Sequence, residues 1–316
     1  MKAWQFTGTH QPLVLNEIPA PAPGPGEVVL DIRAAGLCHS DVGVLEDEGW
    51  LSSFPRLPMT MGHEVAGVIV AVGEGVTEWA VGDRVGVCPT AGGDTVPGYS
   101  RDGGFTAQHL APAADLVRMP EGLSFELAAA GTDAGMTSYH AVKTIGGVKA
   151  GDRVAIVGLG GLGQIGARVA VVLGAEVYVA EVNEDVWPLA QKIGATEVVK
   201  DVAELAGRDL DVVVDYAGFG TTTADALKAI RPGGTVVVVG MGKLEATIST
   251  YDVIMKQARI LGSMGGTKQD VADCYELFAA GQVTPVVTTI GFGEIPEGVE
   301  RLRRGEVTGR LVALMA

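Results

Sequence analysis

Cysteine is scarce in this chain of 316 residues: only three are present, and they are unevenly spaced. Such spacing provides no disulfide framework. Basic residues are also in the minority, because 38 Asp and Glu outnumber 23 Lys and Arg and leave a formal net charge of −15. Since binding to nucleic acids or anionic membranes requires clustered Lys and Arg, we expect neither as a partner.

Long apolar runs are lacking too. The opening residues, MKAWQFTGTH, contain no signal-peptide core, and stretches such as VAVVLGA are too short to span a bilayer. We therefore expect a cytoplasmic protein without a membrane segment. Hydrophobic residues nevertheless make up 47% of the chain, enough for a substantial core in one large domain or two ordinary ones.

The sequence divides into two parts with different patterns of apolar residues. Residues 1–133 are rich in short β-branched runs closed by Gly or Asp, which predicts a mostly antiparallel, partly barrel-like β unit. In residues 134–265, buried strands alternate with helices, which predicts a parallel sheet covered on both faces and an α/β fold. Residues 266–316 hold one helix and β-like segments that would return to the first unit.

A glycine motif opens the second unit. Gly158, Gly160 and Gly163 have the G-x-G-x-x-G spacing, directly after the strand-like RVAIV and before a helix of small residues. In this context the motif binds the pyrophosphate of a dinucleotide, although a turn without a ligand would have the same pattern. Glu181 ends the next predicted strand, where a carboxylate accepts hydrogen bonds from the adenosine ribose.

The acidity of that strand end favours NAD over NADP. Glu181 is followed by Glu184 and Asp185, and the next basic residue along the chain is Lys192. A 2′-phosphate at this position would meet like charge, which near a protein surface costs about 4 kcal/mol at a separation of about 4 Å.

The first unit holds candidate metal ligands. Cys38 lies in GLCHSD, His63 in GHE, and Asp133 interrupts an apolar run of small residues. Together they offer a thiolate, an imidazole and a carboxylate, and three protein ligands with one open position are typical of catalytic zinc. Taken alone, Cys38 would more often be a small buried core residue.

These motifs together resemble the zinc-dependent medium-chain alcohol dehydrogenases over essentially the whole chain. The resemblance rests on GLCHSD, GHEVAGVIVAVGEGV, VGDRV, DAGMTSYHA, GLGGLG and GEVTGRLV. It implies a GroES-like catalytic domain (1–133, completed by 266–316) and a Rossmann domain (134–265), with the active site between them. It also implies that Cys38, His63 and Asp133 bind one catalytic Zn²⁺, with Asp133 standing where many members have a second cysteine.

Further roles follow from the resemblance alone. Asp41 would orient the zinc-bound histidine, Glu64 would lie near the metal, and Ser40 would take the substrate proton. His39 and Arg310 would contact the pyrophosphate, while Thr137 and Leu162 would pack against the nicotinamide. Each of these residues also has an ordinary structural explanation, such as a turn hydroxyl, a salt bridge or helix packing.

The chain departs from the family pattern twice. The cysteine-rich lobe that holds a structural zinc in many members is missing, and Cys88 is the only cysteine in that region, so we expect one zinc per chain, with Cys88 and Cys274 unligated. Gly43 replaces a histidine that ends a proton relay in many members, so the proton would leave through water.

The resemblance therefore implies an NAD-dependent enzyme that interconverts alcohols with aldehydes or ketones, acting on small molecules and assembling as a homodimer or homotetramer. One alternative is a reductase of C=C or C=N bonds with the same fold. Another is a dinucleotide-binding protein without catalytic activity. The sequence does not name the substrate, although Trp50, Leu51 and Tyr99 are candidates to line its pocket.

Overall fold

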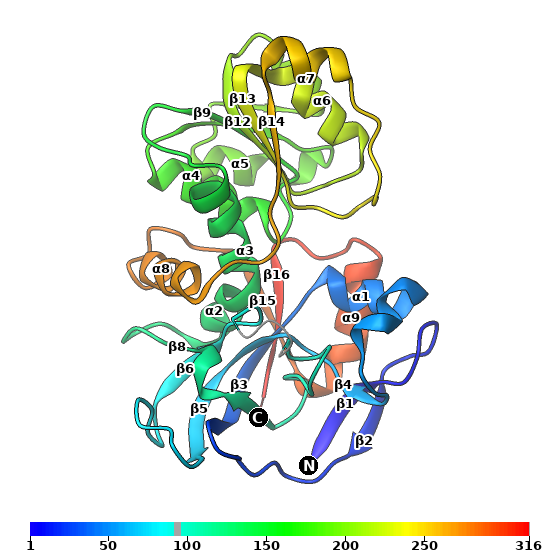
Figure 1. Ribbon diagram of the computed structural model, residues 1–316, viewed down its shortest axis with the longest axis vertical. Helices are drawn as coiled ribbons and strands as arrows, with labels where there is room; N and C mark the ends of the chain where they lie inside the picture. Colours follow the sequence, from blue (N-terminus) through cyan, green and yellow to red (C-terminus); the bar gives the residue numbers. More distant parts are fainter. Residues whose placement is uncertain (92–95, 316) are drawn as a thin grey trace. The chain divides into compact units, whose positions relative to one another are not determined.

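A computed structural model describes residues 1–91 and 96–315, and the chain divides into two compact units (Figure 1). The β-rich unit comprises Met1–Asp133, Thr267–Ala279 and Val286–Ala316, and the parallel-sheet unit comprises Ala134–Gly266 and Ala280–Pro285. Positions 92–95 belong to the stretch in which the family's cysteine-rich lobe is missing. They lie outside the described residues, as does position 316.

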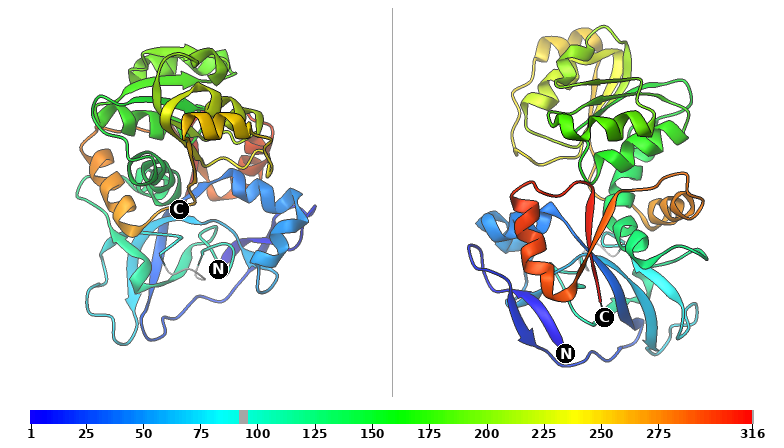
Figure 2. Two further views of the ribbon diagram at one scale, coloured as in Figure 1. Left: turned by 45° about the horizontal axis from the view of Figure 1, so that its top comes forward. Right: turned by 180° about the vertical axis from the view of Figure 1, so that it is seen from behind.

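The β-rich unit contains two sheets. Strands β2-β1-β4 form the small sheet, and β15-β16-β3-β5-β6-β8 form the large one, with β7 also paired to β3. Strand β16 lies antiparallel beside β3 although the two are far apart in sequence (Figure 2). The strand bounds are β1 Lys2–Phe6, β2 Val14–Glu17, β3 Glu27–Leu37, β4 Met59–Thr60, β5 Glu64–Val72, β6 Arg84–Val87, β7 Gln108–Pro112, β8 Leu116–Arg118, β15 Val287–Gly291 and β16 Arg310–Leu314.

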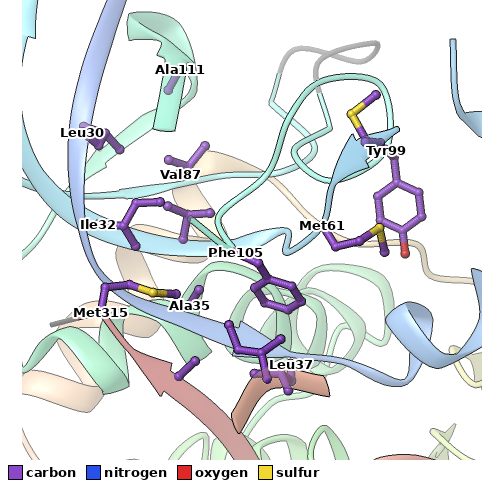
Figure 3. Close-up of a cluster of buried hydrophobic side chains, with 14 of the residues drawn as sticks. Leu30, Ile32, Ala35, Leu37, Met61, Val87, Tyr99, Phe105, Ala111 and Met315 are labelled. Carbon is purple, nitrogen blue, oxygen red and sulfur yellow. The ribbon is translucent and has the colours of Figure 1, made fainter. Parts of the chain in front are cut away.

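One hydrophobic cluster fills the interior of this unit. Alternating side chains of β3 point into it, including Leu30 and Ile32, because successive residues of a strand face opposite sides (Figure 3). Phe105 and Met61, which both lie outside the named strands, join them, and both are fully buried. The helices of the unit are α1 His39–Glu46, α2 Phe125–Ala130, α8 Lys268–Ala279 and α9 Ile295–Arg303.

The parallel-sheet unit has six strands in the order β11-β10-β9-β12-β13-β14, and all its strand pairs are parallel. Helices α4 and α5 pack together on one face, and α6 and α7 on the other (Figure 1). The bounds are β9 Arg153–Val157, β10 Glu176–Ala180, β11 Glu197–Val199, β12 Leu210–Asp215, β13 Ile230–Val238, β14 Arg259–Gly262, α3 Met136–Tyr139, α4 Gly163–Val172, α5 Trp187–Ile193, α6 Thr221–Ala229 and α7 Thr250–Lys256.

This strand order reverses direction at β9, which pairs with β10 on one side and with β12 on the other. Open α/β sheets bind their ligands beyond the carboxyl ends of the strands at such a switch point. The glycine motif of residues 158–163 follows β9 at this position. The predicted α/β class is confirmed. Within residues 1–91 and 96–315, no helix has the length and apolar character needed to cross a bilayer.

Candidate functional site

Cys38 is placed by a short turn between a strand and a helix. Strand β3 ends at Leu37, and α1 begins at His39 with Cys38 as its N-cap in an extended conformation. The backbone N–H of Cys38 donates to the Asp41 carboxylate at 2.8 Å. An acidic side chain in the first turn satisfies an N–H group that the helix cannot satisfy itself. The local sequence CHSD thus fixes the thiol and this carboxylate relative to each other.

The neighbouring pair His63 and Glu64 stands at the start of β5, which lies antiparallel to β3. Gly36 of β3 is opposite Glu64 in the sheet register. A Cβ atom at Gly36 would come within 1.8 Å of Glu64 Oε2, so only glycine leaves space for this carboxylate. Asp133 lies in a π-helical turn, Gly131–Gly135, a distortion that often marks functional sites.

These segments bring four potential ligands together in the β-rich unit. One ligand atom from each of Cys38, His63, Glu64 and Asp133 lies within 4.8 Å of every other. Asp133 Oδ2 is 3.7 Å from Cys38 Sγ and 3.5 Å from His63 Nε2. A thiol, an imidazole and carboxylates that converge in this way form a donor set that suits Zn²⁺. The three predicted ligands are therefore close together.

Electrostatics favour a cation among these groups. Burial acts to lower the pKa of His63, but Asp41 and Asp133 outweigh it and hold that pKa well above its usual range. Burial acts to raise the pKa of the Cys38 thiol, but Arg310 and His63 make the net direction downward. Metal binding requires a thiolate and a neutral imidazole, so a divalent cation would take the place of the imidazolium proton.

A buried ion pair borders the cluster, and sequence reasoning had not paired its members. Arg310 Nε donates to Glu64 Oε2 at 3.1 Å, and the terminal nitrogen of Arg310 contacts the other oxygen of Glu64 and Asp133 Oδ2, the latter at 3.2 Å. Arg310 is 2% exposed and Glu64 is fully buried. In this structure the Arg310 guanidinium is engaged by these two carboxylates. Its contact with a pyrophosphate stays a prediction.

The other predicted residues of this unit lie around the thiol. Ser40 Oγ is 3.5 Å from Cys38 Sγ and is half-buried, while His39 is exposed at the start of α1. Asp41 is buried, and its Oδ1 lies 3.5 Å from His63 Nδ1. With this carboxylate beside Nδ1, the other ring nitrogen, Nε2, faces Asp133 at 3.5 Å.

In the parallel-sheet unit, each motif glycine has a separate steric reason. Gly158 has φ +85°, which side chains disfavour. A Cβ at Gly163 would lie 1.8 Å from the Gly158 carbonyl oxygen, so the loop and α4 pack too closely for any other residue. A Cβ at Gly160 would meet nothing within 4 Å, which leaves this backbone open to an approaching pyrophosphate. The loop fits a dinucleotide.

The Glu181 side chain also holds the glycine loop in place by hydrogen bonds to backbone N–H groups. The sequence position of Glu181 does not reveal this role. Its Oε2 accepts from the Leu159 N–H at 2.6 Å, and its Oε1 accepts from the Asn183 N–H at 2.8 Å. Because an ionised carboxylate has about four acceptor sites, two sites remain for ribose hydroxyls. Lys200 pairs with Glu184 at 2.5 Å and offsets its charge, so the argument against a 2′-phosphate rests mainly on Glu181.

Thr137 and Leu162 are close to the same loop. Thr137 is buried in α3, and the hydroxyl of its neighbour Ser138 donates to the Leu162 carbonyl at 2.9 Å. This bond joins α3 to the residue that precedes α4. The packing of Thr137 and Leu162 against a nicotinamide stays a prediction.

The remaining cysteines lie apart from the metal cluster. Cys88 and Cys274 are both buried, and burial raises the pKa of each thiol. Among the residues that the structure describes, the cluster around Cys38 is the only group of three or more potential metal ligands.

Two family models match the chain. Residues 24–121 match the alcohol dehydrogenase GroES-like domain, and residues 161–280 match the zinc-binding dehydrogenase domain. The chain is 34% identical to an alcohol dehydrogenase of Geobacillus stearothermophilus, with 99% of each protein covered.

Solved structures agree. An acetophenone reductase from Geotrichum candidum in complex with NAD has a TM-score of 0.90 at 32% identity, covering 99% of this chain and 96% of that one. An alcohol dehydrogenase from the archaeon Aeropyrum pernix has a TM-score of 0.91 at 31% identity, covering 99% and 100%. The predicted family and its GroES-like and Rossmann folds are confirmed. This chain belongs to the zinc-dependent alcohol dehydrogenases of the medium-chain dehydrogenase/reductase superfamily.

Proposed function

We propose that this protein is an NAD-dependent alcohol dehydrogenase that interconverts alcohols with aldehydes or ketones at one zinc ion held by Cys38, His63 and Asp133. The observation that carries the proposal is the convergence of these three side chains, from distant parts of the chain, within 4.8 Å of one another. An apolar substrate pocket or a packing role would not require a thiol, an imidazole and a carboxylate at one point.

The chemistry is divided between the bound groups and the protein. Zinc would polarise the substrate oxygen as a Lewis acid, and NAD would exchange a hydride with the carbon. We assign to Ser40 the role of accepting the alcohol proton, a role supported by the position of its half-buried hydroxyl beside the Cys38 thiol. Asp41 holds His63, and Gly43 offers no group to accept the proton next, so water takes it from Ser40.

Glu64 and Arg310 maintain the charge of the site. The Arg310 guanidinium neutralises Glu64 and also contacts Asp133, which stabilises two carboxylates close to the thiol. NAD would be held in the parallel-sheet unit by the backbone of Gly158, Gly160 and Gly163 and by Glu181. His39, Thr137 and Leu162 are proposed cofactor contacts on the basis of the family resemblance.

We propose a homodimer as the basic assembly. Strand β14 is the edge of the six-stranded sheet, and all four of its residues are exposed. Tyr251, Ile254 and Met255 of α7 are also exposed. An apolar sheet edge left open to water is prone to pair with another strand, and a second copy would cover both edges at once. A tetramer and a cytoplasmic location stay predictions of the sequence.

One panel tests the function: turnover of primary, secondary, cyclic and aromatic alcohols with NAD, and of the matching carbonyl compounds with NADH. Turnover should be lost with a zinc chelator and should return with added zinc. Ser40→Ala should slow alcohol oxidation while zinc content stays at the wild-type level. Activity that persists without metal would favour a reductase of C=C or C=N bonds, and tight NAD binding with no turnover would favour a non-catalytic binding protein.

A further inference from the structure

Tyr99 is held beside the metal cluster by close backbone packing. A Cβ at Gly98 would lie 2.9 Å from the Gly62 backbone nitrogen, and one at Gly103 would lie 2.3 Å from the Gly62 carbonyl oxygen. The N–H of Gly104 also donates to the Gly62 carbonyl at 2.7 Å. The loop that carries Tyr99 therefore packs directly against Gly62, the residue that precedes His63.

The ring of Tyr99 lies among aromatic neighbours. Its centroid is 5.7 Å from that of His63, 6.0 Å from that of Trp50 and 5.5 Å from that of Phe54. Tyr99 belongs to the same hydrophobic cluster as Leu30 and Ile32, and Figure 3 shows it at the far side of that cluster from them, next to Met61. The phenol thus belongs to the surroundings of a zinc ligand.

The Tyr99 hydroxyl is buried without a partner. The residue is 8% exposed, and its oxygen makes no hydrogen bond to any of the described residues. Most buried polar atoms are satisfied, because leaving one unpaired costs about 1–3 kcal/mol. Phenylalanine would provide the same packing at this position without that cost. Tyr99 therefore carries a hydrogen-bond donor beside the metal cluster that none of the described residues accepts from.

We propose that the Tyr99 hydroxyl donates a hydrogen bond to a second oxygen atom of the substrate. This assignment builds on the proposed alcohol dehydrogenase activity and names its substrate class: alcohols and carbonyl compounds with another oxygen on the carbon next to the reacting carbon. Vicinal diols and α-hydroxyketones are examples. Because the Tyr99 ring packs with its centroid 5.7 Å from that of the zinc ligand His63, the second oxygen would lie near the reacting carbon.

A matched pair of substrates tests the proposal. Hydroxyacetone and butan-2-one have equal numbers of non-hydrogen atoms and differ by a hydroxyl in place of a methyl group. For the wild type we expect kcat/KM with NADH to be at least tenfold higher for hydroxyacetone. Tyr99→Phe should reduce this ratio at least fivefold by slowing hydroxyacetone alone. Tyr178→Phe is the control, because it removes a phenol hydroxyl in β10, where its partner is Glu176, and it should leave the ratio unchanged.

The outcomes separate the two proposals. If the wild type reduces neither ketone nor any compound of the alcohol panel, the proposed function is wrong. If it reduces both ketones with equal efficiency, or if Tyr99→Phe keeps the wild-type ratio, the hydroxyl serves only packing or a bound water, and the substrate assignment is wrong. The wild-type ratio alone can refute the assignment, so the test holds even if Tyr99→Phe folds poorly.

Discussion

The buried pair of Arg310 and Glu64 makes a quantitative prediction for stability. Replacing Arg310 by Met leaves a fully buried carboxylate without its cation. Breaking a buried ion pair from one side costs about 3–5 kcal/mol, because the remaining charge has lost both water and partner. For a unit of this size each kcal/mol lowers Tm by about 2–4 °C, so Arg310→Met should lower the Tm of the β-rich unit by about 6–20 °C.

The double variant Glu64→Met/Arg310→Met should be more stable than Arg310→Met alone. Two apolar side chains of similar volume then replace the pair, and such exchanges are often close to neutral. Arg33→Met is the matched control. The Arg33 pair with Asp31 has a similar distance, 2.9 Å, but lies at the surface with side chains 47% and 35% exposed, and such surface pairs contribute only about 0–1 kcal/mol.

Circular dichroism during heating measures the Tm of the wild type and of each variant. A zinc chelator is added so that metal bound by Asp133 does not contribute to the Tm. The reasoning is refuted if Arg310→Met melts within about 4 °C of the wild type, which is the range expected for an exposed pair. It is also refuted if the double variant is no more stable than the single one, because the cost would then come from lost packing and not from an unpaired carboxylate.

Three further predictions concern charge, metal and cofactor. His109 is buried. Burial, and after it the charge of Arg101, lower its pKa to about 3, so between about pH 3 and 6.5 the imidazole is protonated in the unfolded chain and neutral in the folded one. The contribution of neutral His109 to the free energy of unfolding is complete above pH 6.5 and is lost as the pH falls toward 3, at about 1.4 kcal/mol per pH unit. His109→Phe should therefore make the denaturation midpoint depend less steeply on pH. Elemental analysis should find about one zinc per chain; Cys38→Ala should remove it and Cys88→Ala should not, whereas two zincs in the wild type would contradict the site. Steady-state kinetics should give at least tenfold higher kcat/KM with NAD than with NADP, a ratio that Glu181→Gln should reduce; equal efficiency in the wild type would contradict the role of Glu181.

The parallel-sheet unit was predictable because its signals are local. A buried strand followed by a glycine loop and a helix of small residues occupies one continuous stretch, from Arg153 to Val172. The acidic residue at the end of the next strand is at a fixed spacing. Pro188 fits this pattern too, because it lies in the first turn of α5, where a missing backbone N–H does no harm.

Helix α1 was not predictable in the same way. It has eight residues, begins directly at the metal cluster and contains Gly43, and its apolar residues do not form a clear helical stripe. An isolated helix of this length is unstable, so the surrounding structure must hold it. Asp41 caps its start, and α9 packs against it. The cap is local, but the packing against α9 joins segments more than 240 residues apart, and no local pattern could show it.

The same limit applied to the charges of the site. A thiolate from Cys38, a carboxylate from Asp133 and a neutral imidazole from His63 balance Zn²⁺, and that count needs only the motifs. Glu64 adds a further negative charge within 4.8 Å of the other ligand atoms, which would unbalance the centre and offer a fourth protein ligand. Arg310, 246 positions away in the sequence, cancels this charge and occupies both carboxylate oxygens. Because a catalytic zinc site needs an open position for substrate, the pairing of Arg310 with Glu64 keeps the centre both neutral and open. A structural zinc site, which uses four protein ligands, would have no need for such a cation.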